Sequence, residues 1–231
     1  MAPGAKGRTI GKENSLNFLN NLKGFLMKPI STGILFLFAL LLFAGCSGVP
    51  PTYYYRIDYP LEIQHDKSPN FPWTLGIGQF SADILYEGDR IVYRESPYEA
   101  QYYHYRRWIA PPKKIVPEHV RKDYLASGVF GKVVSLPSAQ KVDYVLTGNV
   151  EAFEEVDEGS TWSGLVTIRF QLRDAKTKEI IWEESISERT TARKREPVEV
   201  VRAISESLNK TISRSISSIK ASLQTNNTSA F

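Results

Sequence analysis

Residues 163–174 read SGLVTIRFQLRD, and this segment already limits the chain to a fold built around a sheet. Apolar side chains occupy every second position: Val166, Ile168, Phe170 and Leu172. The positions between them are Leu165, Thr167, Arg169 and Gln171. A period of two places successive side chains on opposite faces of a strand, so one face is buried and the other meets water. We predict a half-buried antiparallel strand.

Two further long strands flank this segment, over residues 143–155 and 179–190. The turn at residues 174–178 joins the central strand to the following one, which predicts a long antiparallel hairpin. An acidic cluster at residues 151–158 lacks the order of side chains that a calcium-binding loop needs. We interpret it as the solvated tip of a hairpin at Gly159-Ser160.

The last element is an amphipathic helix that starts after Pro197. Its apolar residues recur every three or four positions: Val198, Val201, Ile204, Leu208, Ile212, Ile216, Ile219 and Leu223. This spacing forms one continuous stripe along a helix. A narrow stripe is typical of a helix that lies on a sheet, and contact with a partner subunit or a membrane is the alternative.

Residues 53–126 are predicted to form shorter elements. Strands are predicted at the aromatic residues 53–58 and at residues 73–80, where side chains alternate with a period of two. Residues 90–95 and 101–108 are predicted to form a strand pair around Ser96-Pro97. A helix is predicted from Pro117 to Ala126, and its inward-facing residues are expected to be Val120, Tyr124 and Leu125.

These elements together predict an α/β (α+β) fold. We expect one domain over residues 53–223, with a mixed, largely antiparallel sheet and two helices packed on it. Residues 224–231 are polar, and we expect a flexible tail there.

The only cysteine, Cys46, ends an apolar segment near the amino terminus. The uninterrupted apolar run from Ile34 to Ala44 has 11 residues, whereas a transmembrane helix needs roughly 20. A short apolar run after a basic segment is typical of a secretory signal peptide. With Ala44 and Gly45 before the cysteine, the segment resembles a bacterial lipobox, which implies that Cys46 is diacylated and that residues 1–45 are removed.

The mature protein would then begin with a lipidated tether, residues 46–52, whose two prolines favour an extended chain. Met27, just before Lys28, would be a more ordinary first residue for a signal peptide. A start there, without residues 1–26, is therefore an alternative to a start at Met1.

Removal of the leader changes the charge of the protein. Residues 1–45 contain five basic residues and one acidic residue: Lys6, Arg8, Lys12, Lys23, Lys28 and Glu13. The leader therefore carries +4, which equals the formal net charge of the whole chain. The mature part is about neutral, so its charge does not indicate a nucleic-acid partner.

The sequence offers little support for a catalytic role. Cys46 is consumed by the anchor, and His65, His104 and His119 lie in different elements without the spacing of a metal site. Gly76-Ile77-Gly78 lacks the third glycine of a dinucleotide-binding turn, and the sequence contains neither a Walker motif nor a nucleophile elbow. We predict a protein that is not an enzyme and has no metal or cofactor beyond the covalent lipid.

Two groups of residues are candidates for contact with a partner or with lipid. The aromatic group, which suits either a core or an interface, is Tyr102, Tyr103, Tyr105 and Trp108. The basic group, which suits either a solvated loop or contact with phospholipid headgroups or an acidic partner, is Arg193, Lys194 and Arg195.

A series of short motifs runs through the mature chain. They are YYYRID (53–58), RIVYR (90–94), YYHYRRW (102–108) with Pro111-Pro112, DYVLTG (143–148) and Ile181-Trp182. In this order and spacing they resemble the auxiliary lipoproteins of ABC-type envelope transport systems. The resemblance covers roughly residues 50–220.

The resemblance implies a function and a place in the cell. Family members are lipoprotein partners of MCE-domain (mammalian cell entry) proteins and of an ABC permease and ATPase, which move lipids between the membranes of Gram-negative bacteria. They have a compact α/β domain, and some form rings, so a homo-oligomer is one expectation. Ser47, rather than aspartate, follows the cysteine and favours sorting to the outer membrane. We expect a palmitate-type lipid anchor in the inner leaflet of that membrane and a periplasmic domain that docks or aligns the transport assembly.

Two other functions remain open. The domain could be a stand-alone periplasmic module that binds a lipid or another hydrophobic ligand between the sheet and the last helix. It could also be an assembly factor for an outer-membrane protein.

The lipobox yields a direct prediction. Mass spectrometry of the protein isolated from its native membrane should find Cys46 as the first residue, carrying a thioether-linked diacylglycerol and an N-acyl chain. An intact precursor in the cytosol with an unmodified thiol would contradict the lipoprotein interpretation.

Overall fold

Three long antiparallel strands form the centre of the structure: β6 (Tyr144–Glu158), β7 (Thr161–Asp174) and β8 (Ile180–Thr191). In this computed structural model, residues 48–61 and 69–228 are described, so the predicted signal peptide and Cys46 lie outside the described part. The four apolar side chains of β7 predicted to face inward are fully buried. The alternation that predicted this strand and its hairpin is therefore confirmed.

One edge of β6 pairs with β7, and its other edge is shared by two strands. β2 (Phe71–Ala82) pairs in parallel with the first half of β6, up to Val150. β3 (Arg90–Ser96) pairs in parallel with the second half, from Glu154 to Val156. The sheet therefore divides at β6 into two wings.

Each wing is extended outward by further strands. β5 (Phe130–Ser135) pairs in parallel with β2. On the other wing, β4 (Glu99–Trp108) forms an antiparallel hairpin with β3, and β1 (Tyr53–Tyr55) pairs in parallel with β4. The result is an eight-stranded mixed sheet, as predicted, with its two longest ladders antiparallel.

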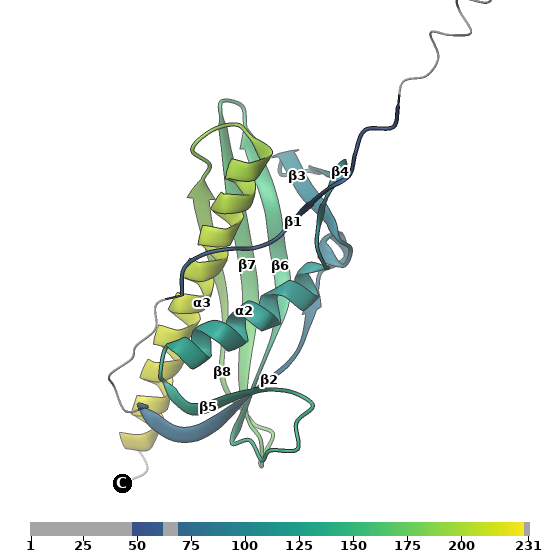
Figure 1. Cartoon of the computed structure of the whole chain (residues 1–231). Helices are drawn as coiled ribbons and strands as arrows, with labels where there is room; N and C mark the ends of the chain where they lie inside the picture. Colours follow the sequence, from purple (N-terminus) through teal and green to yellow (C-terminus); the bar gives the residue numbers. More distant parts are fainter. Residues whose placement is uncertain (1–47, 62–68, 229–231) are drawn as a thin grey trace, which may run out of the picture. The chain divides into compact units, whose positions relative to one another are not determined.

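Two helices, α2 (Pro112–Ala126) and α3 (Pro197–Thr228), cover one face of the sheet (Figure 1). α3 packs on β7 and β8, while α2 packs on β2 and β5. The two helices also touch, and the hydroxyl groups of Tyr124 and Ser215 lie 3.0 Å apart in a hydrogen bond.

The predicted apolar stripe of α3 faces the sheet. Its fully buried members are Ile204, Leu208, Ile212 and Ile219. Val198, at the first turn, is 57% exposed, so its assignment to the buried stripe is wrong. The helix continues to Thr228, so the chain is helical over residues 224–228, where we had expected a flexible tail.

Several details of the first half differ from the sequence prediction. α2 begins at Pro112, five residues before the predicted start, because proline suits the first turn of a helix, where no backbone N–H donor is needed. Leu125 is 54% exposed rather than buried. β5 was missed, because Gly131 and Lys132 interrupt its alternation. A one-turn 3₁₀ helix at Ile84–Tyr86 was also missed.

The backbone of α3 lies directly against β7 at Gly164. The hydroxyl of Ser207 donates a hydrogen bond to the Gly164 carbonyl at 2.8 Å. A Cβ atom at Gly164 would overlap the backbone of Ala203 and Ile204. This position therefore requires glycine for a close approach of two backbones.

The close approach at Gly164 predicts that one added methyl group there lowers the stability of the domain. Gly164→Ala should lower the free energy of unfolding by about 1–3 kcal/mol, because the helix must shift to accept the added atom. Urea unfolding of the mature protein measures this loss. Gly88→Ala, where an added Cβ meets no atom within 4 Å, is the control and should change little. Equal stability of the two variants would contradict the packing described here.

Candidate docking and anchoring surface

The segment after β1 runs from the edge of the sheet to α3, and we call residues 56–61 the strap (Figure 1). Ile57 is 6% exposed and belongs to the core. The backbone N–H of Asp58 donates to the Oγ of Ser205 on α3 at 3.3 Å. The hydroxyl of Tyr59 donates to Oδ2 of Asp123 on α2 at 2.8 Å. The strap thus ties the start of the domain to both helices.

The strand before the strap is held at the edge of the sheet. β1 lies beside Arg106–Trp108 of β4, and the carbonyl of Tyr55 accepts a hydrogen bond from the N–H of Ile109 at 2.9 Å. Tyr53 stands seven residues after Cys46. Even a fully extended chain of that length reaches only about 25 Å.

Titratable groups under the strap are perturbed by burial. Burial raises the pKa of Asp123 to about 6, against the hydrogen bond from Tyr59 and the charge of Lys122, which lower it. Burial also lowers the pKa of His119 to about 4, and Lys122 adds to this effect. Sequence reasoning missed Asp123, although it lies three residues after Val120 and beside Tyr124, on the predicted inward side of α2.

A cleft of about 520 Å³ lies between the strap and α2. Its apolar lining includes Ile57, Leu61 and Ile109, while Lys114 and Lys122 contribute positive charge. Leu61, in its lining, is the last described residue before position 69.

The four aromatic residues singled out on β4 are not equivalent. Trp108 is 1% exposed and packs edge-on against Phe153, with ring centroids 5.0 Å apart, so it belongs to the core and offers no contact to a partner. Tyr103 is half-buried, and its hydroxyl donates to Oε2 of Glu155 at 3.0 Å. Tyr102 and Tyr105 are 36% and 41% exposed.

The basic run lies in the loop between β8 and α3. Arg195 forms an ion pair with Asp157 at 3.5 Å, and its guanidinium lies 5.1 Å from the ring centre of Trp162. Arg193 and Lys194 are exposed, and neither forms an ion pair with a described residue.

Glu155 connects the two predicted groups. Its side chain is buried on β6, and burial, the largest cause, raises the pKa of the carboxyl to about 7. Asp157 raises it further, whereas the hydrogen bond from Tyr103 and the charges of Arg106 and Arg195 lower it. Tyr103 therefore contacts this buried carboxyl directly, while Arg195, paired with Asp157, acts on it through its charge. Sequence reasoning had interpreted Glu155 only as part of a solvated hairpin.

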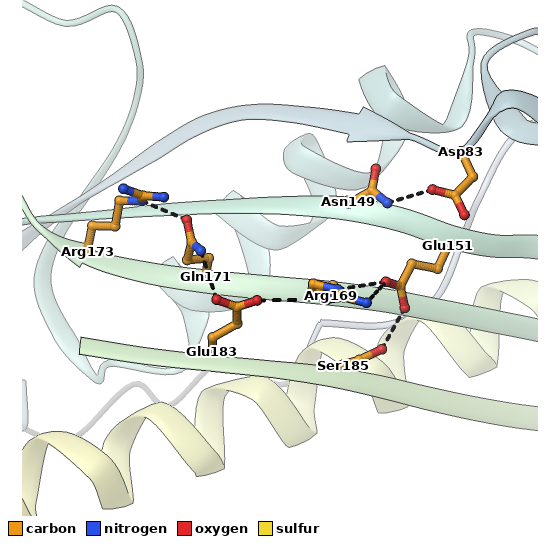
Figure 2. A network of polar contacts seen from close by, with 8 residues as sticks. All are labelled: Asp83, Asn149, Glu151, Arg169, Gln171, Arg173, Glu183 and Ser185. Atoms are coloured by element: carbon orange, nitrogen blue, oxygen red, sulfur yellow. Dashed lines mark hydrogen bonds and ion pairs between the residues drawn. The ribbon is translucent and has the colours of Figure 1, made fainter. Parts of the chain in front are cut away.

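The sheet face opposite the helices is polar (Figure 2). Eight residues from four parts of the chain line it: Asp83, Asn149, Glu151, Arg169, Gln171, Arg173, Glu183 and Ser185. Arg169 binds Oε1 of Glu151 through two nitrogens, each at 2.7 Å, and Ser185 donates to Oε2 of the same carboxylate. These polar groups pair with one another across β6, β7 and β8.

The interior between the sheet and α3 is filled. Ile204, Leu208 and Ile212 are fully buried there, and α3 touches the backbone of β7 at Gly164. Within residues 48–61 and 69–228, no three acidic, histidine or cysteine side chains gather as they would around a metal ion. Among those same residues, no helix is long and apolar enough to cross a membrane.

Comparison with known proteins identifies a matching family and similar solved structures. A family model described as ABC-type transport auxiliary lipoprotein component matches residues 60–216. The crystal structure of protein XCC0632 from Xanthomonas campestris is similar with a TM-score of 0.67 and 19% identity, covering 76% of this chain and 99% of that one. A crystal structure of an uncharacterized protein has a TM-score of 0.59 and 16% identity, covering 74% and 99%. At these identities the two structures support the fold alone. No curated protein is similar enough in sequence to count as a relative.

The raised pKa of Glu155 predicts how stability depends on pH. Because its folded pKa lies above the ordinary value of 4.5, the folded state loses stability as the pH rises from about 4.5 to about 7. Glu155→Gln keeps the acceptor for Tyr103 and removes the charge. The variant should match the wild type at low pH and exceed it above about pH 7 by on the order of 1–3 kcal/mol, since one pKa unit corresponds to about 1.4 kcal/mol.

Urea unfolding across this pH range measures the difference between the two proteins. Glu95→Gln, at an exposed position of β3, is the control for the loss of one negative charge. If Glu155→Gln shows the same pH dependence as the wild type, the carboxyl is not buried in the way described.

Proposed function

The chain belongs to the ABC-type transport auxiliary lipoprotein family, and we propose that it is a non-catalytic, membrane-anchored docking component of a system that transports lipids between the two membranes of a Gram-negative envelope. In this role, lipid on Cys46 holds the domain at the inner leaflet of the outer membrane. The domain then meets an MCE-domain protein that works with an ABC permease and ATPase. The ATP is hydrolysed elsewhere in the system.

One observation carries the proposal: the strap makes the first residues after the tether part of the folded domain. Ile57 is buried, and the hydrogen bonds of Asp58 and Tyr59 reach α3 and α2. A component that aligns an assembly must pass the position of its anchor to its docking surface. A flexible connection of many residues would not do so, whereas the connection between Cys46 and β1 consists of residues 47–52 alone.

A lipid anchor also favours docking, because it raises the local concentration of the domain beside the membrane. A diacylglycerol with a further acyl chain gives stable membrane attachment, unlike a single chain. Attachment confines the domain to a thin layer beside the membrane, which raises its effective concentration toward any partner that reaches this layer. Docking contacts can then be weak individually and still hold the assembly.

The filled interior weighs against the stand-alone carrier. A hydrophobic ligand between the sheet and α3 would have to displace Ile204, Leu208 and Ile212, which are fully buried. Deletion or displacement of such residues costs several kcal/mol. For the third alternative, an assembly factor for an outer-membrane protein, no particular contact in the described residues argues in favour.

Crosslinking in the native envelope tests the docking role. A photoreactive amino acid is placed at Ser187, on the polar sheet face, or at Ser217, on the exposed side of α3. We expect one of these positions to crosslink to an MCE-domain protein, identified by mass spectrometry. The matched pair distinguishes the two broad faces of the domain, since both residues are exposed serines.

The control is the same protein with Cys46→Ser, which should remain unanchored and lose most of the crosslink. If the anchored protein crosslinks to no MCE-domain protein from either face, the docking role fails. Lipid that co-purifies with the delipidated mature protein in stoichiometric amounts would favour the carrier instead.

A further inference from the structure

We propose that four exposed tyrosines at one edge of the sheet lie in the headgroup layer of the membrane that anchors Cys46, and so orient the domain on that membrane. The four residues are Tyr53, Tyr54, Tyr102 and Tyr105, and we call them the tyrosine edge. This inference rests on the lipid anchor of the proposed function, and it adds the surface that the protein turns toward the lipid.

The tyrosine edge is built from two neighbouring strands. Tyr53 and Tyr54 are 57% and 64% exposed on β1, while Tyr102 and Tyr105 are 36% and 41% exposed on β4. β1 is an outermost strand of the sheet, and Tyr53 lies opposite Arg106, next to Tyr105. The four residues therefore lie on the two strands at one sheet edge, β1 and β4 (Figure 1), with Tyr53 and Tyr54 on opposite faces of β1.

The tyrosine edge differs from the other tyrosines of the same strands. Tyr103 donates its hydroxyl to Glu155, and Tyr55 packs against the core. None of the four hydroxyl groups of the tyrosine edge makes a hydrogen bond to a described residue. Tyrosine combines an apolar ring with a polar tip, and it is enriched where membrane lipid meets water for this reason.

The length of the connecting chain brings this edge to the bilayer. Tyr53 stands seven residues after Cys46, which limits the separation of their Cα atoms to about 25 Å. Pro50 and Pro51 stand between them. β8, by contrast, pairs only with β7, which lies beside β6, so β8 is a different outer strand of the sheet from β1. The anchor thus keeps β1, rather than β8, near the lipid.

The arginines of this edge lie over tyrosine rings or pair with an acid, and the guanidinium of Arg90 lies 6.0 Å from the ring centre of Tyr102. Arg107 is paired with Asp89 at 2.9 Å, and the guanidinium of Arg106 lies 4.4 Å from the ring centre of Tyr103. The positive charge of the run Arg193-Lys194-Arg195 is partly neutralised, because Arg195 is paired with Asp157 and Glu196 follows directly. We therefore expect the contact to form on zwitterionic as well as anionic lipid, and to persist at high salt, unlike a polybasic contact.

Single-cysteine labelling of the full lipidated protein tests the inference. Cys46 is the only cysteine and is acylated in the anchored form, so Tyr54→Cys or Tyr105→Cys provides one free thiol for a fluorophore. Lys176→Cys, in the turn before β8, is the reference position. The proteins are reconstituted at low density into vesicles of phosphatidylcholine, or of phosphatidylethanolamine with phosphatidylglycerol, and quenching by iodide is measured.

We expect labels at positions 54 and 105 to be quenched severalfold less than the label at 176, on both lipids and at high salt. Tyr102→Ser/Tyr105→Ser should raise the quenching of a label at 54. The matched control Leu125→Ser/Ile180→Ser, which removes two exposed apolar side chains elsewhere, should leave it unchanged.

Labels at 54 and 105 that are quenched as readily as the label at 176 would overturn the inference and leave the anchored docking role intact. Shielding only at high protein density would show that a second copy covers the edge, and shielding only with added envelope proteins would show a protein partner. Both outcomes also overturn it. Protein that lacks acylation and does not enter the vesicles would instead refute the proposed function.

Discussion

The attachment of the strap to both helices is the constraint on which this account depends. Tyr59 and Asp58 reach α2 and α3 from a segment that begins a few residues after the tether. Because Asp123 is buried and Oδ1 of its carboxylate has no partner among the described residues, the hydrogen bond from Tyr59 compensates part of a desolvation cost that would otherwise remain. Residues 53–61 are therefore part of the fold, and in the proposed role a force on the anchor would act on the whole domain.

The other features of the fold favour a rigid domain over a domain that encloses a ligand. β6 joins the two wings of the sheet, and α3 lies so close to β7 that Gly164 has no room for a Cβ atom. The face away from the helices is covered by mutually paired polar groups such as Arg169 and Glu151. A solid domain with a short tether can hold a position at a membrane, and this is the property that a docking component needs.

Much of this could be predicted from the sequence, for identifiable reasons. The alternation of residues 165–172 and the stripe of α3 reflect burial on one face, which is the strongest local signal a chain carries. The sharing of β6 between β2 and β3 leaves no such signal, because parallel pairing joins segments far apart in the chain. Glu155 was read as solvated, since only the fold shows that Tyr103 and two arginines surround it. The exposed and buried tyrosines of β4 likewise look alike until β1 and β6 are placed beside them.

Amide hydrogen exchange on the membrane-anchored mature protein tests the central claim most directly. If the strap is part of the fold, the N–H of Asp58, bonded to Ser205, and that of Ile109, bonded to Tyr55, exchange as slowly as amides in the middle of α3. Residues 47–52 should exchange at the rate of a free chain. Exchange of Asp58 and Ile109 at the same fast rate as the tether would show that the anchor is loosely connected to the domain and would contradict the account.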